Sequence, residues 1–123
     1  MILGLGTDIV EIPRIAAVLE RHGDQFMERV FTADETKQAD GRIAYFAGRW
    51  AAKEAAAKAL GCGIGEKCAL TDIEVIDDAN GAPRLSCTAP ALDDYKVRKL
   101  HWHVSISHEK NFAVATVILE SVD

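Results

Sequence analysis

The sequence lacks any long hydrophobic run. No apolar stretch approaches the roughly 20 residues that a membrane-spanning helix needs, so we predict no membrane partner. The first residues show neither a basic segment nor a cleavage site, and we therefore expect no signal peptide. Repeats, low-complexity tracts and linkers are also absent. With 123 residues, 49% of them hydrophobic, the chain is predicted to form a single domain over residues 1–123.

Cysteine and positive charge are scarce. The three cysteines, Cys62, Cys68 and Cys87, are odd in number and have no Cys-x-x-Cys spacing, which argues against a disulfide framework or a zinc site. Reduced thiols are typical of the cytoplasm, where we place the protein. Lys and Arg number 14 against 19 Asp and Glu, giving a net charge of −5. Nucleic acid is not a predicted partner, because binding to it usually needs a basic surface.

The order of predicted elements is one strand, then helices, then mostly strands, which indicates an α+β fold. Pro13 suits the start of a helix that Gly23 ends, and Thr32 with Glu35 forms a capping box for another. The Asn80-Gly81 pair suits a hairpin turn. We predict strands over residues 2–10, 71–76, 83–88, 102–107 and 112–119, and helices over 13–23, 26–31, 43–60 and 91–99.

The clearest helix runs from Ile43 to Leu60 and stops at Gly61. It contains eight alanines, which raise its helix propensity and allow close packing against a neighbour. Gly4 and Gly6 leave one face of the first strand without side chains, so another element can approach its backbone closely.

Charged residues in these two elements are the first candidates for chemistry. Asp8 stands on the glycine face of the first strand, where it is either a solvated carboxylate or a functional one. Glu54 and Lys58 are four residues apart in the alanine-rich helix, as are Arg49 and Lys53. These pairs are either salt bridges on a solvated face, or a carboxylate for a hard cation beside cations for phosphate.

A polar strand face is the second candidate. Alternation places His103, Ser105 and Ser107 on one side of the predicted strand, where they either bind an anion or form the exposed face of an edge strand. No Gly-x-Ser-x-Gly elbow occurs, and the glycine loop after the long helix is not a Walker loop, since no Gly-Lys-Ser/Thr ends it.

Three segments in order carry a resemblance: GLGTDIVEI at residues 4–12, FAGRWAAKEAAAKALG at 46–61 and HVSISH at 103–108. Together they resemble the holo-acyl-carrier-protein synthase family, the short phosphopantetheinyl transferases. The resemblance implies the 4′-phosphopantetheinyl transferase fold, with a small antiparallel sheet packed against a long alanine-rich helix. It implies a reaction of fatty acid biosynthesis, the transfer of 4′-phosphopantetheine from coenzyme A to a serine of apo acyl carrier protein, with adenosine 3′,5′-bisphosphate as leaving group.

The resemblance also assigns residues by position in these motifs. Asp8 and Glu54 are the implied ligands of Mg²⁺, and Lys58 the implied catalytic group that neutralises or protonates the leaving bisphosphate. Glu54 is the candidate base for the serine proton, directly or through a metal-bound water. Besides Lys58, the expected contacts of coenzyme A are Arg49, Lys53, Gly61, His103 and Ser105.

An acidic carrier protein needs a local basic patch on this acidic chain. Arg14 and Arg21 on the first predicted helix are the candidates, although either can be an ordinary solubilising arginine. The resemblance implies a homotrimer with active sites between subunits, and we expect the alanine-rich helix to suit such packing. An alternative function is a non-catalytic binding module for coenzyme A or the carrier. Intact Asp8, Glu54 and Lys58 argue against it.

Overall fold

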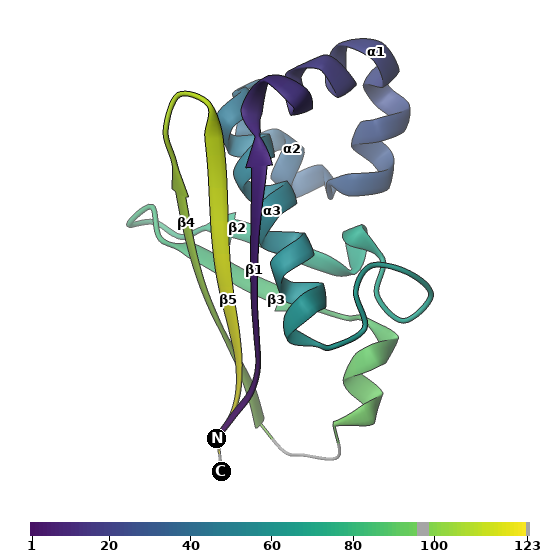
Figure 1. Cartoon of the computed structure of the whole chain (residues 1–123), viewed down its shortest axis with the longest axis vertical. Helices are drawn as coiled ribbons and strands as arrows, with labels where there is room; N and C mark the ends of the chain where they lie inside the picture. The colour runs from purple at the N-terminus through teal and green to yellow at the C-terminus, as the bar shows by residue number, and fades with distance from the viewer. Residues whose placement is uncertain (96–98, 123) are drawn as a thin grey trace.

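The computed structural model describes residues 1–95 and 99–122 and confirms an α+β architecture (Figure 1). A three-stranded antiparallel sheet has the order β1-β5-β4, and β2 and β3 form a separate hairpin. None of the helices in these residues is long and apolar enough to cross a membrane. The elements are β1 Ile2–Glu11, α1 Ile12–Val30, α2 Ala33–Ala39, α3 Ile43–Ala59, β2 Ile73–Asp77, β3 Pro83–Cys87, β4 Lys99–His108 and β5 Phe112–Val122, with short 3-10 helices at Leu70–Asp72 and Pro90–Asp94.

Several boundaries differ from those predicted. Residues 71–72 belong to a 3-10 turn rather than to β2, because the Asp72 carboxylate accepts the backbone N–H of Ala69 at 2.9 Å and closes the turn. β4 begins at Lys99 because its pairing with β5 continues to Val122. The helix predicted over 91–99 is the 3-10 helix Pro90–Asp94, and residues 96–98 lie outside the described residues.

Two sequence features that we predicted to mark helix ends, Gly23 and the capping box at Thr32, have these positions in the structure. Gly23 interrupts α1 with a φ of 48°, a conformation that glycine adopts without strain, and the two halves meet there at a kink. Thr32 Oγ1 accepts the N–H of Glu35 at 3.2 Å, and the Glu35 carboxylate accepts the N–H of Thr32 at 2.9 Å. This capping box starts α2 as predicted.

The backbone of α3 lies directly on the backbone of β1. A Cβ atom at Gly4 would lie 1.8 Å from the carbonyl oxygen of Ala59, and one at Gly6 would lie 1.8 Å from that of Ala55. Only glycine fits at these two strand positions while the helix stays in place. The predicted close packing of α3 is therefore confirmed, and its partner is the chain's own first strand.

The opposite side of α3 carries a buried ion pair. Lys53 and Glu35 are both fully buried, and Lys53 Nζ lies 2.6 Å from Glu35 Oε1. Lys53 also donates to the carbonyl oxygens of Leu70 and Ile73, and Glu35 accepts the N–H of Val75 at 2.7 Å. Burial lowers the pKa of Lys53, and the Glu35 carboxylate opposes this shift. The pair links α2, α3 and β2, and removal of one partner would cost about 3–5 kcal/mol.

Arg49, like Lys53, is buried and paired with a carboxylate. Its guanidinium pairs with Asp77 at 2.5 Å, donates to the Val75 carbonyl and lies 3.7 Å from the Tyr45 ring centroid. The prediction that Arg49 and Lys53 bind nucleotide phosphates is contradicted, because both side chains are buried and already bonded to carboxylates. The alternative of a solvated salt-bridge face is contradicted for the same reason.

Candidate active site

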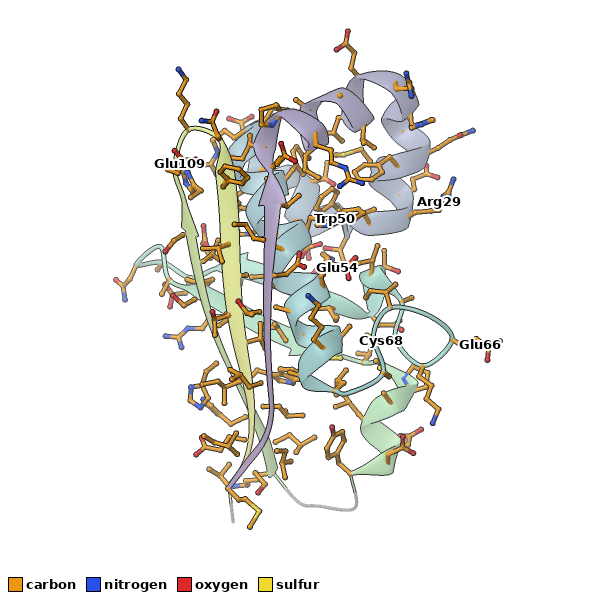
Figure 2. All side chains as sticks on the ribbon, viewed as in Figure 1. Arg29, Trp50, Glu54, Glu66, Cys68 and Glu109 are labelled. Carbon is orange, nitrogen blue, oxygen red and sulfur yellow. The ribbon has the colours of Figure 1, made fainter. Side chains whose placement is uncertain are left out.

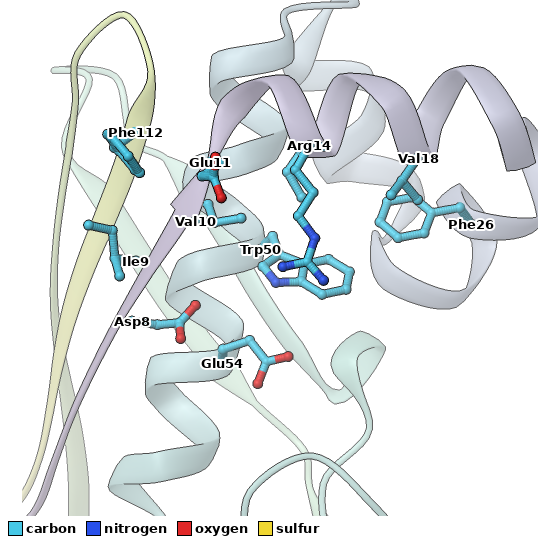
Figure 3. Close-up of a pocket in the computed structure, with 11 residues that line it drawn as sticks. Asp8, Ile9, Val10, Glu11, Arg14, Val18, Phe26, Trp50, Glu54 and Phe112 are labelled. Carbon is cyan, nitrogen blue, oxygen red and sulfur yellow. The ribbon is translucent and has the colours of Figure 1, made fainter.

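Two carboxylates project into one pocket from different elements (Figure 3). Asp8 follows Gly4 and Gly6 on the face of β1 that meets α3. Glu54 projects from α3 beside this strand. The glycine contact brings the two backbones together, so these distant positions in the sequence face the same space, as the motifs predicted.

The charges of this pair interact. Partial burial raises the pKa of Glu54, the nearby Asp8 carboxylate raises that pKa further, and Lys58 opposes both effects. Lys58 Nζ lies 3.1 Å from Asp8 Oδ1 and 3.0 Å from the carbonyl oxygen of Thr7. The Lys58 ammonium group thus lies beside the Asp8 carboxylate. A metal ion bound to this carboxylate would compete with it.

Asp8 and Glu54 could hold a hard divalent cation. Across residues 1–95 and 99–122, no set of three or more His, Cys, Asp and Glu side chains is arranged to hold a metal ion. Two carboxylates suit Mg²⁺, which binds through one or two of them and completes its octahedron with water and substrate phosphate. The donor set fits this ion better than zinc, which prefers cysteine and histidine.

The pocket has a volume of about 480 Å³ and an aromatic wall. The rings of Phe26 and Trp50 are stacked, with centroids 5.3 Å apart, and Arg14 extends from α1 along the same wall (Figure 3). Phe26, Trp50 and Phe112 were not among the predicted site residues. Trp50 precedes Glu54 by one helical turn on the same face, and this spacing was the available signal.

Other predicted site residues lie away from this pocket. Gly61 begins an exposed loop after α3, with a φ of 80°. His103 and Ser105 lie on the outer face of the sheet, because Trp102 and Val104 face inward. The His103 ring is 2.9 Å from the Glu120 carboxylate. Within one chain, the structure does not bring His103 or Ser105 to Asp8 and Glu54.

The predicted basic patch lies on α1. Arg14 and Arg21 are exposed and border one shallow hollow on this helix, and Arg14 also lines the pocket of Asp8 and Glu54. Arg14 is thus placed between solvent and the candidate site, and Arg21 lies further along the same helix. This position is compatible with the docking of an acidic partner.

Glu54→Gln is expected not to destabilise the protein at neutral pH. The folded state raises the pKa of Glu54, so ionised Glu54 costs stability at high pH and this cost disappears as the pH falls through that pKa. Glutamine resembles the protonated form at every pH. Urea unfolding should give Glu54→Gln a midpoint at or above wild type at neutral pH, with the gap closing in acid.

Glu66→Gln, in the exposed loop after α3, is the matched control (Figure 2). At neutral pH, an unfolding midpoint for Glu54→Gln clearly below those of wild type and the control would contradict our claim that ionised Glu54 destabilises the folded state.

Comparisons with known proteins agree with this geometry. The family model of the 4′-phosphopantetheinyl transferase superfamily matches residues 4–117. A holo-[acyl-carrier-protein] synthase of Edwardsiella ictaluri is 50% identical over 125 residues, covering 97% of this chain and 98% of that protein. A crystal structure of the synthase from Bacillus anthracis, in complex with CoA (3′,5′-ADP), has 43% identity and a TM-score of 0.83 and covers 99% of both chains. The Helicobacter pylori synthase in complex with coenzyme A has 33% identity and a TM-score of 0.85, covering 94% of this chain and 99% of that one. With its fold, its carboxylate pair and these relatives in agreement, the chain belongs to the 4′-phosphopantetheinyl transferase superfamily, among the holo-[acyl-carrier-protein] synthases.

Proposed function

We propose that the protein transfers the 4′-phosphopantetheine group of coenzyme A to a serine of an apo acyl carrier protein, in a Mg²⁺-dependent reaction. The observation that carries this proposal is the pocket in which Asp8, Glu54 and Lys58 meet. Relatives named as holo-[acyl-carrier-protein] synthases, and solved relatives in complex with coenzyme A, support it. The free thiols of the three cysteines fit a reaction in the cytoplasm.

The reaction is a displacement at a pyrophosphate phosphorus. The serine oxygen forms a bond to the β-phosphorus of coenzyme A, and the bond from this phosphorus to adenosine 3′,5′-bisphosphate breaks. Mg²⁺ held by Asp8 and Glu54 would supply the charge neutralisation that such a displacement requires. Lys58 is the cation of this chain best placed to neutralise the leaving bisphosphate, once it exchanges its contact with Asp8 for phosphate oxygens.

Glu54 is our candidate for the group that receives the serine proton. Its carboxylate lines the pocket, and burial and Asp8 raise its pKa above that of an ordinary glutamate. A raised pKa makes a carboxylate a better base at neutral pH. Trp50 and Phe26 close one wall of the pocket and limit the access of water to the reacting phosphorus.

The outer face of the sheet supports a homotrimer. Leu5 and Ile9 are 63% and 64% exposed there, beside Val114 of the paired strand β5. Ile9 and Phe112 belong both to this face and to the pocket of Asp8 and Glu54, so a neighbouring copy seated on the face would complete the pocket. The alanines of α3 do not supply this interface, because they are buried within the chain.

His103 and Ser105 are contributors to the pocket of a neighbouring subunit in this proposal. Both are exposed on the same outer face, on β4. A hydroxyl and an imidazole there could bind the nucleotide phosphates that this chain's own Arg49 and Lys53 cannot reach. The exposed loop that begins at Gly61 keeps its expected role near the nucleotide. The N–H groups of Gly61, Gly63 and Gly65 donate to carbonyl oxygens of this chain, so other backbone N–H groups of the loop would make the contact.

Mass spectrometry of an apo carrier protein incubated with coenzyme A and Mg²⁺ tests the function. We expect a mass gain of one phosphopantetheine with wild type and none with Asp8→Ala, which loses a metal ligand. Asp93→Ala, at an exposed acidic position away from the pocket, is the control and should keep the activity. The absence of any gain with several carriers would disprove the proposal, and a fully active Asp8→Ala would remove Asp8 from the metal site.

Lys58→Met should tighten Mg²⁺ binding to the free protein. The ammonium group 3.1 Å from Asp8 Oδ1 competes with a metal cation for this carboxylate, and methionine removes the charge but keeps the length of the side chain. Isothermal titration without coenzyme A should show a several-fold lower Kd for the variant. Lys67→Met, at an exposed lysine of the loop, should leave the Kd unchanged. Equal or weaker binding by Lys58→Met would show that Lys58 does not compete for the metal position.

Arg14→Glu should slow association with the carrier protein. An exposed charge acts mainly by steering, so the cost should be about 1 kcal/mol at low salt and should shrink as salt rises. Surface plasmon resonance at several salt concentrations measures this, with Arg21→Glu beside it. Arg84→Glu on β3 makes the same charge change away from α1. If all three variants associate alike, α1 is not the docking surface.

Light scattering coupled to size exclusion tests the trimer. Wild type should have three times the mass of one chain, and Leu5→Glu should have a lower mass because it places charge on the outer sheet face. Ile64→Glu, at an exposed apolar position of the loop after α3, should remain trimeric. A monomeric mass for an active wild-type preparation would refute the shared pocket.

A further inference from the structure

Two histidine rings lie side by side on β4. His101 and His103 alternate with the half-buried Trp102, so both side chains project from the same, solvent-exposed face of the strand. The centroids of the two rings are 4.6 Å apart, and the ring planes are inclined at 54° to each other. His101 has no role in the proposed transfer.

A carboxylate on the neighbouring strand fixes the orientation of one of these rings. Glu120 of β5 is the register partner of His101, and its Oε1 atom lies 2.9 Å from Nε2 of His103. An ionised carboxylate only accepts hydrogen bonds, so Nε2 carries the proton in this contact. The bond from His103 lowers the pKa of Glu120, which favours the ionised carboxylate. In the neutral ring, the lone pair of Nδ1 is therefore left for another partner.

The separation of the two rings fits two imidazoles bound to one metal ion. A histidine nitrogen lies about 2.0–2.1 Å from a bound Zn²⁺, and the centre of its ring lies about 1.2 Å further out. With an angle of about 90–110° between the two metal–nitrogen bonds, the ring centres are then about 4.5–5.2 Å apart. The observed 4.6 Å falls within this range.

The surroundings of the rings also suit a cation. A carboxylate that accepts the second N–H of a histidine is the usual support of a metal ligand, because it orients the ring and makes it more basic. Glu120 has this place behind His103. The positive charges nearby are Lys99, exposed on the same strand face, and the N-terminal ammonium group, which donates to the Ser121 carbonyl at 2.9 Å. The charge of Glu120 opposes them.

We propose that His101 and His103 chelate a divalent transition-metal ion, with Glu120 orienting His103. No group of three or more potential side-chain ligands is present among the residues that the structure describes, so water completes the coordination of the ion. Imidazole suits nickel, copper and zinc, whereas Mg²⁺ prefers oxygen ligands. The site therefore differs in chemistry from that of Asp8 and Glu54. This inference does not depend on the proposed transfer reaction.

Ni²⁺ is the probe for the test, because it binds imidazole and its unpaired electrons broaden nearby NMR signals. The full chain is titrated at neutral pH in excess Mg²⁺ and without coenzyme A, so that neither the carboxylate pair nor a nucleotide contact of His103 interferes. We expect one Ni²⁺ per chain, and the ring signals of His101 and His103 should broaden before those of His22 and His108. No binding, or equal broadening of all four histidines, would overturn the proposal.

Single substitutions test the two ligands by isothermal titration. His101→Gln and His103→Gln should each raise the Kd for Ni²⁺ by about tenfold or more, since one imidazole then remains of the chelate. His22→Gln, at an exposed histidine of α1, is the matched control and should leave the Kd unchanged. Asp8→Ala should bind Ni²⁺ as wild type does. A normal Kd for His101→Gln, an equal loss in His22→Gln, or a loss in Asp8→Ala would overturn the assignment.

Glu120 is tested with two further variants. Glu120→Ala keeps both imidazoles but removes the acceptor behind His103, and it should raise the Kd by about tenfold. Glu120→Gln still offers an oxygen to the N–H of His103 and should retain more of the affinity. Circular dichroism serves as the check that both variants fold. If folded Glu120→Ala binds Ni²⁺ as tightly as wild type, Glu120 does not orient a metal ligand.

Discussion

The contact between β1 and α3 is the constraint on which the rest of the structure depends. Carbonyl oxygens of Ala55 and Ala59 lie where side chains at Gly4 and Gly6 would project. A strand and a helix that meet without intervening side chains have little freedom to shift. Asp8, the next residue on that face of the strand, is therefore held beside Glu54 of the helix.

Neighbouring charged residues of α3 differ in burial, because the helix directs them toward different elements of the fold. Glu54 and Lys58 point toward β1 and the pocket. Arg49 and Lys53 point toward β2 and α2, where Asp77 and Glu35 neutralise them in the interior. Buried pairs of this kind contribute little net stability, but removal of one partner is costly. We interpret these two ion pairs as contacts that fix the position of α3 against α2 and β2. The face of α3 that carries Glu54 and Lys58 therefore stays in place against β1.

The two faces of the three-stranded sheet also differ in their surroundings. Its inner face packs against α3 through small and branched side chains, among them Ala113, Ala115 and Val117. Its outer face carries exposed apolar side chains beside the polar His103 and Ser105, and it reaches the pocket at Ile9 and Phe112. A domain of this size has little depth of its own, and for this reason we propose that the coenzyme A site is shared between copies.

The sequence by itself determined the α+β order, the alanine-rich helix, the glycine face of β1 and the capping box at Thr32, because these depend on local propensity and spacing. It also determined that Asp8, Glu54 and Lys58 were candidates for one site, since their motifs resemble those of a known family. Only the tertiary structure decided which charges of α3 are buried, because Glu35 and Asp77 are distant in the sequence and carry no local signal of their pairing. It likewise decided that Trp50 and Phe26 form a wall, and that His103 and Ser105 face away from their own pocket. Each of these depends on contacts between elements, and local sequence patterns do not encode such contacts.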